Sequence, residues 1–312
     1  MIITITMNPA IDKTVEIDQL VHGGLNRINC VTKDAGGKGI NVSKTIKALG
    51  GESVATGFLG GQTGETIRLI LKQLEITEDF VTIDSETRVN TKVVEKGGFV
   101  TELNESGPTI TNQSLQLLLE TLNRYLEKEQ LLVLSGSVPN GIPRDIYRCL
   151  TECAHSKGAK VLVDAEGDLF ANALLAKPDI VKPNKEELEK YVGHALDSVE
   201  EVVQAGKELL EKDVKIVIIS LGADGAYFMD KEHTLYSPGL SVKVNSTVGA
   251  GDAMVAAFSL GIDQGLSFEE CAKLAMATSA GAVTTVGTKP PTKNTVDELL
   301  EQIILVKNVL KE

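Results

Sequence analysis

Two glycines and an aspartate precede a nearly uncharged stretch near residue 250. Residues 244–261 read VNSTVGAGDAMVAAFSLG, and the run Ala253–Leu260 predicts a helix that is buried on most sides. The first turn of a helix presents unpaired backbone N–H groups and the positive end of the helix dipole. Gly249 and Gly251 would let the backbone come close to a ligand. Together these features favour an anion site, typically for phosphate.

Asp252 places a carboxylate where a phosphate would approach, and two interpretations follow. A carboxylate in the first turn can simply complement the helix dipole, which contributes about 0.3–1 kcal/mol. It can instead take a proton from a hydroxyl group while neighbouring N–H groups hold a transferring phosphoryl group. From this segment alone the first interpretation is the commoner one, so the rest of the chain must decide.

Composition bounds the class of protein. The chain has 312 residues and 42% hydrophobic content, enough for one large α/β domain or one domain with a small appendage. Its formal net charge of −12 makes nucleic acid and anionic membranes poor partners. A small anionic substrate would therefore need basic side chains gathered locally.

Cysteine spacing and the N-terminus indicate a compartment. The four cysteines show no paired CxxC spacing, which favours reduced thiols over disulfides or zinc. The first residues lack the basic and apolar regions of a signal peptide, and no run approaches the roughly 20 apolar residues of a membrane span. We therefore expect a cytoplasmic protein.

The N-terminal third supplies further polar groups next to turns. A strand is expected at Ile2–Thr6, and Asp12 follows its end, where open α/β sheets bind ligands. Residues 35–42 read AGGKGINV and precede a helix expected at Asn41–Leu49. Lys38 makes this a basic glycine turn but not a P-loop, because glycine and not Ser or Thr follows it. An ordinary βα turn with an incidental lysine remains open.

Two ribbons are expected to form a small lid. The polar, alternating segment Thr14–Val31, which carries Arg27, predicts a hairpin that stands away from the core. Residues 87–94 read TRVNTKVV, and the period of two places Arg88, Asn90 and Lys92 on one face. That face could bind a phosphorylated sugar, or it could belong to a solvated edge strand. We place the lid at about 12–34 and 87–104.

Three later segments have both a structural and a functional interpretation. Asn184 and Glu187 have the spacing of a helix capping box, and they could also orient waters around Mg²⁺. The turn 221–226 (LGADGA) could meet nucleotide phosphates. The small residues of an expected helix Ser267–Val286 could pack on another helix or on an adenine ring. A last amphipathic helix is expected at Asp297–Lys311.

Strands alternate with helices through most of the chain, which predicts a mainly parallel sheet covered on both faces. We expect one α/β domain over residues 1–312. Right-handed crossovers bring the carboxyl ends of such strands to one edge. The residues expected along that edge are Asp12, Gly37, Ser137, Asn184, Gly222 and Gly249.

The ordered motifs resemble those of the ribokinase-like sugar kinases over essentially the whole chain. The two signatures are GGKGINV at 36–42 and TVGAGD at 247–252. NPAID at 8–12, SGS at 135–137, KPNKEE at 182–187 and SLG at 220–222 accompany them. The resemblance implies a three-layer sandwich with a mainly parallel central sheet and a small β-sheet lid. One departure is Ser246, where many relatives carry Asp.

The resemblance also implies phosphorylation of a sugar hydroxyl that depends on ATP and Mg²⁺. Asp252 matches the catalytic base, and Gly249, Ala250 and Gly251 match the anion hole. The implied sugar-binding residues are Asp12, Arg27, Gly37, Lys38, Asn41, Arg88, Asn90, Lys92 and Ser137. The implied nucleotide-binding residues are Asn184, Ser220, Gly222, Gly225, Thr247, Gly251 and Ser279, and Asn184 and Glu187 match the pair that organises the metal through water.

Within this family, Lys38, Arg27 and Arg88 suggest a substrate that already carries phosphate. The Arg88–Asn90–Lys92 strand is similar to that of bacterial 1-phosphofructokinases, which implies conversion of fructose 1-phosphate to fructose 1,6-bisphosphate. A tagatose-6-phosphate kinase and a non-catalytic sugar-phosphate sensor remain alternatives. A dinucleotide-dependent dehydrogenase is a weaker one, because no GxGxxG follows the first strand. The lid edge could also pair in a homodimer.

Overall fold

The computed structural model describes residues 1–307, and an 11-stranded sheet forms its centre. Its strands are β1 (Ile2–Thr6), β4 (Ser53–Gly60), β5 (Thr77–Glu78), β6 (Val81–Ile83), β9 (Leu131–Ser135), β10 (Lys160–Asp164), β11 (Ile180–Val181), β12 (Ile216–Ser220), β13 (Ala226–Met229), β14 (Thr234–Ser237) and β15 (Val306–Lys307). Their order is β15-β14-β13-β12-β11-β10-β9-β1-β4-β5, with β6 paired to β4. All pairs from β12 to β5 are parallel, and β13, β14 and β15 join antiparallel.

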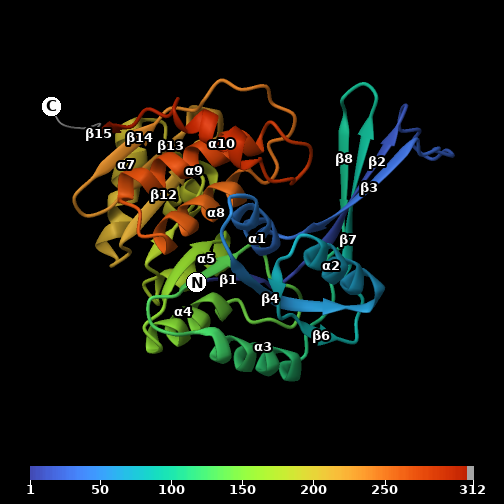
Figure 1. The fold of residues 1–312 in the computed structure, drawn as a ribbon, viewed down its shortest axis with the longest axis horizontal. Coiled ribbons are helices and arrows are strands. Elements are labelled where there is room, and N and C mark those ends of the chain that lie inside the picture. The colour runs from blue at the N-terminus through green and yellow to red at the C-terminus, as the bar shows by residue number, and fades with distance from the viewer. Residues whose placement is uncertain (308–312) are drawn as a thin grey trace.

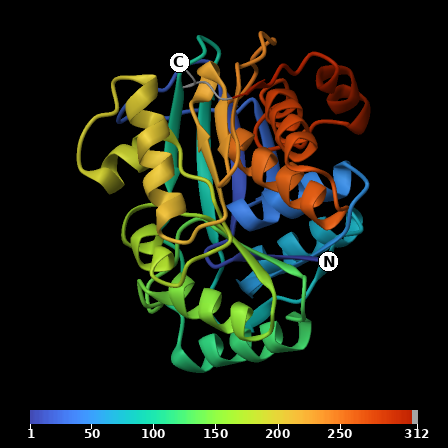
Figure 2. The same ribbon diagram turned by 90° about the vertical axis from the view of Figure 1, so that its left-hand side faces the viewer.

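Helices cover both faces of this sheet, as the sequence predicted (Figures 1 and 2). They are α1 (Lys38–Ala48), α2 (Gly61–Gln73), α3 (Asn112–Tyr125), α4 (Ile146–Ser156), α5 (Gly167–Leu174), α6 (Lys185–Val192), α7 (Val199–Glu211), α8 (Ala250–Asp263), α9 (Phe268–Ala282) and α10 (Lys293–Leu300). Strand β1 shows why two helical layers are needed. Ile3 and Ile5 pack into the core under α3 to α7, whereas Ile2 packs into the core under α1 and α8 to α10. All five residues of β1 are buried, so both faces of the strand must be covered.

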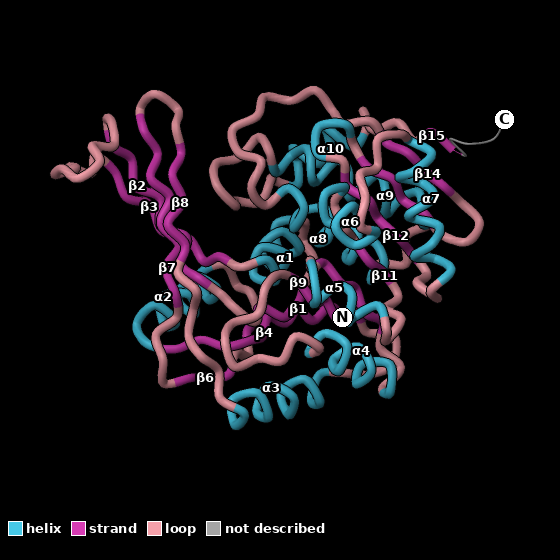
Figure 3. Tube along the Cα trace, turned by 180° about the vertical axis from the view of Figure 1, so that it is seen from behind, coloured by secondary structure: helices cyan, strands magenta, loops and turns pink. Residues whose placement is uncertain are grey.

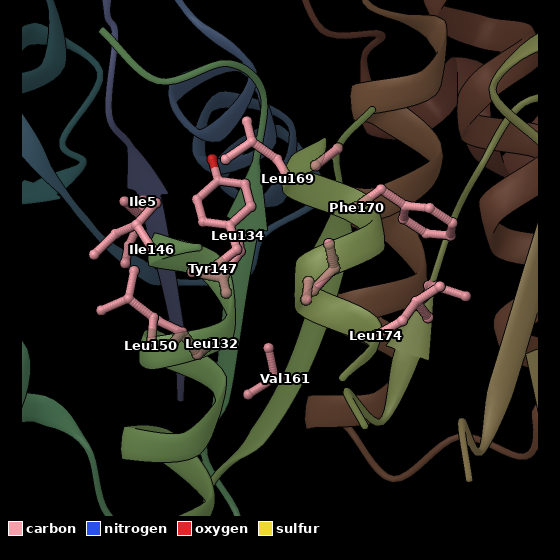
Figure 4. Packing of buried hydrophobic residues seen from close by; sticks show 14 of the residues in the cluster. Ile5, Leu132, Leu134, Ile146, Tyr147, Leu150, Val161, Leu169, Phe170 and Leu174 are labelled. Carbon is pink, nitrogen blue, oxygen red and sulfur yellow. The ribbon is translucent and has the colours of Figure 1, made fainter. Parts of the chain in front are cut away.

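The first of these cores holds the strand ends in place. Figure 4 shows Tyr147 of α4 packed among Leu132, Leu134 and Leu169. The Tyr147 ring is fully buried, and its hydroxyl donates a hydrogen bond to the carbonyl oxygen of Gly136 at 3.0 Å. Because a buried hydroxyl needs a partner, this bond fixes the turn that follows β9.

A four-stranded sheet stands away from the main body (Figures 1 and 3). It contains β2 (Ala10–Ile17), β3 (Cys30–Gly36), β7 (Arg88–Glu95) and β8 (Val100–Asn104), in the order β3-β2-β7-β8. Strands β2 and β7 are parallel, and the other pairs are antiparallel. Strand β7 is therefore an inner strand. The edge-strand interpretation of residues 87–94 is wrong, because β8 satisfies the backbone groups that solvent would otherwise meet.

Two helices begin earlier than the sequence predicted. Helix α1 starts at Lys38 instead of Asn41, and α8 starts at Ala250 instead of Ala253. In each case glycines occupy the N-cap or the first turn. Glycine is a poor helix former in isolation, but here packing at the sheet edge outweighs that propensity.

The expected C-terminal helix 297–311 is wrong. Helix α10 runs only from Lys293 to Leu300, and Val306–Lys307 then pairs with β14 as β15. Residues 303–306 are apolar, and three of them (Ile303, Ile304 and Val306) are β-branched, which favours a strand over a helix here. Residues 308–311 of the expected helix lie outside the described part of the chain. Between residues 1 and 307, none of the helices combines the length and apolar character that crossing a bilayer demands.

Candidate active site

One large cavity lies where the carboxyl ends of the parallel strands face the four-stranded sheet. Its volume is about 1000 Å³. Every residue expected at the site except Arg27 lines it. These are Asp12, Gly37, Lys38, Asn41, Arg88, Asn90, Lys92, Ser137, Asn184, Glu187, Ser220, Gly222, Gly225, Thr247, Gly249, Ala250, Gly251, Asp252 and Ser279. The six residues predicted to lie along one edge of the sheet are thus brought together.

The N-terminus of α8 opens into this cavity. Gly249 is its N-cap, with φ 86° and ψ −7°, a left-handed conformation that glycine adopts without strain. The carbonyl of Gly249 accepts the first helical bond, from the N–H of Ala253 at 2.9 Å. The backbone N–H groups of the first turn of α8, which come before Ala253, have no partner within the helix. They therefore form a positive cradle beside Asp252.

Asp252 is almost buried, with 7% of its surface exposed. Its Oδ2 accepts a hydrogen bond from Nδ2 of Asn41 at 2.8 Å. Burial, and then the nearby Asp164, raise the pKa of Asp252 to about 6, although Lys38, Asn41 and Lys182 act in the opposite direction. A carboxylate with a raised pKa that remains ionised at neutral pH is suited to general-base work.

A charge cluster around the buried Asp164 adjoins Asp252, and the sequence did not reveal this cluster. Asp164 ends strand β10 with only 1% of its side chain exposed, and its Oδ1 lies 3.3 Å from Nζ of Lys38 and 3.2 Å from Nζ of Lys182. Burial raises the pKa of Asp164, but the two lysines outweigh it and hold that pKa below its ordinary value. Asp164 in turn raises the pKa of Lys38. Lys38 is therefore held in its charged form beside the cavity, and the Lys182 ammonium group lies against the same carboxylate.

Two signals could have revealed this cluster. Asp164 is a carboxylate at the end of an apolar strand, the same signal that singled out Asp12. Lys182 opens the KPN motif that was noted for Asn184 alone. In space, Nζ of Lys182 lies 3.4 Å from the position that a Cβ on Gly251 would occupy. Lys182 thus contacts the glycine turn of α8 although it lies far away in sequence.

Strands β2 and β7 present polar groups to the other end of the cavity. Nδ2 of Asn90 donates to Oδ1 of Asp12 at 3.2 Å, and Nζ of Lys92 lies 3.4 Å from Oε1 of Glu102. A Cβ on Gly36 would lie 2.2 Å from Oδ2 of Asp12, so this carboxylate rests directly on the glycine backbone. Burial raises the pKa of Asp12, against the effect of Asn90.

Arg88 has a structural role that its sequence position did not suggest. Nη1 donates to the carbonyl of Glu105 and Nη2 to the carbonyl of Asn8, both at 2.9 Å. Its Nε is buried and has no protein partner among the described residues. Arg88, at the start of β7, therefore ties together the chain segments that precede β2 and follow β8, all at one end of the four-stranded sheet.

The opposite end of the cavity is built from backbone turns. Asn184 and Glu187 form the predicted capping box, with N–H to oxygen distances of 2.9 and 2.8 Å. Residues Gly222–Asp224 form one turn of 3₁₀ helix, closed by a bond from the N–H of Leu221 to the carbonyl of Gly225 at 2.8 Å. Turns of this kind expose N–H groups that suit phosphates.

Arg27 is not brought to this site. It is exposed in the long loop between β2 and β3 and does not line the cavity. Its charge suggested a role in binding a phosphorylated substrate, but β2 carries the chain away from the strand ends over its full length.

Comparison with known proteins agrees with this architecture. Residues 1–295 match the model of the pfkB family carbohydrate kinases. The chain is 37% identical to a 1-phosphofructokinase of Bacillus subtilis, over 97% of this chain and 98% of that protein. It is 36% identical to a D-tagatose-1-phosphate kinase of Bacillus licheniformis, over 91% and 92% of the two chains.

The fold comparison gives the same result. Phosphofructokinase-2 of Escherichia coli, solved in complex with potassium, superposes with a TM-score of 0.92 at 30% identity, covering 96% of this chain and 98% of that chain. The three-layer sandwich with a mainly parallel sheet is therefore a ribokinase-like fold, and the chain is an ATP-dependent sugar kinase. It belongs to the pfkB family of carbohydrate kinases.

Proposed function

We propose that this kinase transfers the γ-phosphoryl group of ATP to the 6-hydroxyl of fructose 1-phosphate, giving fructose 1,6-bisphosphate. The observation that carries the proposal is the shared cavity. Asp252 at the start of α8 and the Arg88, Asn90 and Lys92 side chains of β7 line the same space. A sugar held by its phosphate on β7 would present its far hydroxyl to a buried carboxylate.

Binding of the sugar phosphate is assigned to the lid-facing end. Arg88 and Lys92 supply positive charge there, and Asp12, with Asn90 bound to it, accepts hydrogen bonds from sugar hydroxyls. These local cations matter because the whole chain carries a net charge of −12. Arg can pair with phosphate through two N–H groups, whereas Lys acts as a point charge.

The chemical step is assigned to Asp252 and the first turn of α8. Asp252 takes the proton of the 6-hydroxyl as that oxygen attacks the γ-phosphorus. The N–H groups of Ala250 and Gly251, with the helix dipole, offset the charge on the transferring phosphoryl group. Lys38 and Lys182 add positive charge next to this turn. The remaining rate enhancement comes from holding both reactants in line.

ATP is assigned to the end lined by Ser220, Gly222, Gly225, Thr247 and Ser279. The apolar side chains of Met276 and Val283, which line the same end, suit a flat adenine ring.

The residues of the cavity also fit Mg²⁺. Between residues 1 and 307 no group of three or more His, Cys, Asp or Glu is placed to hold a metal ion, which agrees with the preference of Mg²⁺ for waters and substrate phosphates. Oδ2 of Asp164 is buried and has no hydrogen-bond partner among residues 1–307, and Asn184 and Glu187 line the same cavity, so these residues would orient metal-bound waters. The ion would neutralise phosphate charge.

The four-stranded sheet is proposed to act as the lid of a single domain spanning residues 1–312. Exposed apolar side chains gather on it, including Leu25, Phe99 and Leu103, with 80%, 73% and 59% of their surfaces exposed. A homodimer through the lids would cover them and would bring Arg27 of each chain near a second copy. We place the enzyme in the cytoplasm, where ATP and free thiols such as the four cysteines here are found.

The alternatives differ in substrate or in class. A tagatose phosphate kinase uses the same site, and the similar protein from Bacillus licheniformis acts on D-tagatose 1-phosphate by its name. That name supports a phosphate on carbon 1 over tagatose 6-phosphate. A non-catalytic sensor would need no base, so the buried Asp252 argues against it.

Initial rates of ADP release separate these possibilities. Purified protein is supplied with ATP, Mg²⁺ and fructose 1-phosphate, tagatose 1-phosphate, fructose 6-phosphate or tagatose 6-phosphate in turn. We expect the largest kcat/KM with fructose 1-phosphate. Faster turnover of a 6-phosphate would contradict fructose 1-phosphate as the preferred substrate. Saturable binding without ADP release from any sugar would favour the sensor.

A further inference from the structure

Lys44 on α1 is a buried cation that lies outside the cavity lining. Only 2% of its side chain is exposed. Its Nζ donates to Oδ2 of Asp34 at 2.7 Å and to the carbonyl of Ala35 at 2.9 Å. Burying an ammonium group is costly unless it is paired and hydrogen-bonded. The position of Lys44 therefore calls for an explanation beyond helix stability.

Its partner Asp34 stands opposite the proposed sugar ligand Asp12. The two are cross-strand neighbours in the β2–β3 pair, and like charges placed opposite each other repel. Oδ2 of Asp34 also accepts a hydrogen bond from Oγ1 of Thr288 at 3.4 Å. Thr288 lines the cavity and lies 3.5 Å from where a Cβ on Gly249 would sit. One carboxylate thus contacts α1, the base of the lid and the loop behind the anion cradle.

We propose that Lys44 is a positioning residue for the sugar site: by neutralising Asp34, it keeps the opposite Asp12 ionised and in place to accept hydrogen bonds from sugar hydroxyls. The inference rests on the proposed function for the role of Asp12. It assigns a part in substrate binding to a residue that does not reach the substrate.

The groups around Asp12 make the electrostatic argument specific. Asn90 donates to Asp12 from β7, where Lys92 and Arg88 add positive charge; Lys44 acts from α1 and Asp34 from β3. Burial and Asp34 raise the pKa of Asp12, whereas Asn90, Lys92 and Lys44 lower it. Without Lys44, two carboxyl groups face each other, and one keeps its proton to higher pH. A protonated Asp12 loses acceptor capacity toward the sugar.

The test is calorimetric binding of fructose 1-phosphate without nucleotide, from pH 5.5 to pH 8. The phosphate of the ligand titrates equally for every variant, so the comparison is between variants. For Lys44→Met we expect affinity to fall at a higher pH than in the wild type, with binding at pH 6 weakened roughly threefold to tenfold more than at pH 8. For Asp34→Asn the loss of affinity should occur at a lower pH than in the wild type, because the charge of Lys44 then acts on Asp12 alone. Lys47→Met, on the same helix beside Glu52 and Glu75, is the matched control and should titrate as the wild type does.

Two further variants separate charge from packing. Lys44→Arg should keep the wild-type pH dependence, and the double variant Lys44→Met, Asp34→Asn should recover most of it. A purely structural role for Lys44 would leave the double variant as weak as Lys44→Met, which would overturn the proposal. If Lys44→Met does not fold, as judged by circular dichroism, the shift for Asp34→Asn decides: a shift upward, or none, overturns it. If the wild type itself does not bind fructose 1-phosphate, the proposed substrate is wrong, and the pH shifts are measured with the sugar phosphate that it does bind.

Discussion

Nδ2 of Asn41 donates a 2.8 Å hydrogen bond to Oδ2 of Asp252 across 211 residues of sequence. Asn41 belongs to the first glycine motif and Asp252 to the second. The bond orients the carboxylate and lowers its pKa. Burial has the opposite and larger effect and raises that pKa. The two motifs thus act on one group. The balance between burial and this hydrogen bond helps to set the pH at which Asp252 can work as a base. Several predictions depend on that balance.

Replacement of Asp252 by Asn should abolish most of the turnover and spare binding. Asn keeps the shape and can still accept from Asn41, but it cannot take a proton. We expect kcat to fall by about 10²–10⁴, the usual range for loss of a general base, with KM for the sugar phosphate changed little. Steady-state kinetics by ADP release measure both. Near-normal turnover would remove Asp252 from the role of base.

The pH dependence of kcat should report the Asp252 carboxyl group. Its pKa of about 6 predicts that kcat falls as pH drops through about 6, because the protonated base is inactive. Asn41→Ala removes a contact that lowers this pKa, so the acidic limb should move to higher pH. Asn123→Ala, on the exposed face of α3, should leave the limb where it is. An unchanged limb in Asn41→Ala would show that another group controls the rate.

The ionised Asp252 carboxylate should lower the free energy of unfolding at neutral pH. Its pKa is raised from 3.8 to about 6 in the folded state, so the folded protein binds the proton more tightly than the unfolded chain. The contribution of this group to stability is then fully present below about pH 4 and is lost as pH rises through about 6. Asp252→Asn should therefore raise the free energy of unfolding at pH 7.5 by up to about 3 kcal/mol, about two pKa units. Urea denaturation at pH 7.5 and pH 4.5 measures this, and an equal gain at both values would contradict the linkage.

Disturbing the contact between Gly36 and Asp12 should weaken sugar binding and leave the chemical step unaffected. A methyl group on Gly36 would lie 2.2 Å from Oδ2 of Asp12 and must displace that carboxylate. Gly36→Ala should raise KM for the sugar phosphate several-fold and leave kcat nearly unchanged, because Asp252 is untouched. Gly97→Ala, in the β7–β8 turn, is the matched control, since its nearest neighbour would be 3.6 Å away. Equal effects in both variants would argue against a role for Asp12.

Patterns of local origin could be predicted from the sequence. The alternation of strands and helices, the capping box at Asn184 and the shared face of Arg88, Asn90 and Lys92 follow from side-chain periodicity and capping. Each of these patterns depends only on residues that are close together in the sequence. The convergence of glycine turns on one edge followed from the handedness of parallel crossovers, which is a general rule of such sheets.

Contacts between distant segments were decided only by the tertiary structure. The pairing of Asp164 with Lys38 and Lys182, the anchoring of Arg88 on Asn8 and Glu105, and the burial of Lys44 each join separate elements. No periodicity records such contacts. The same holds for Val306 and Lys307, whose strand depends on the free edge of β14, and for Arg27, which the length of β2 carries away from the cavity. The sequence alone therefore determined the layers and the motifs at their edge, whereas packing among distant elements decided which charges meet there.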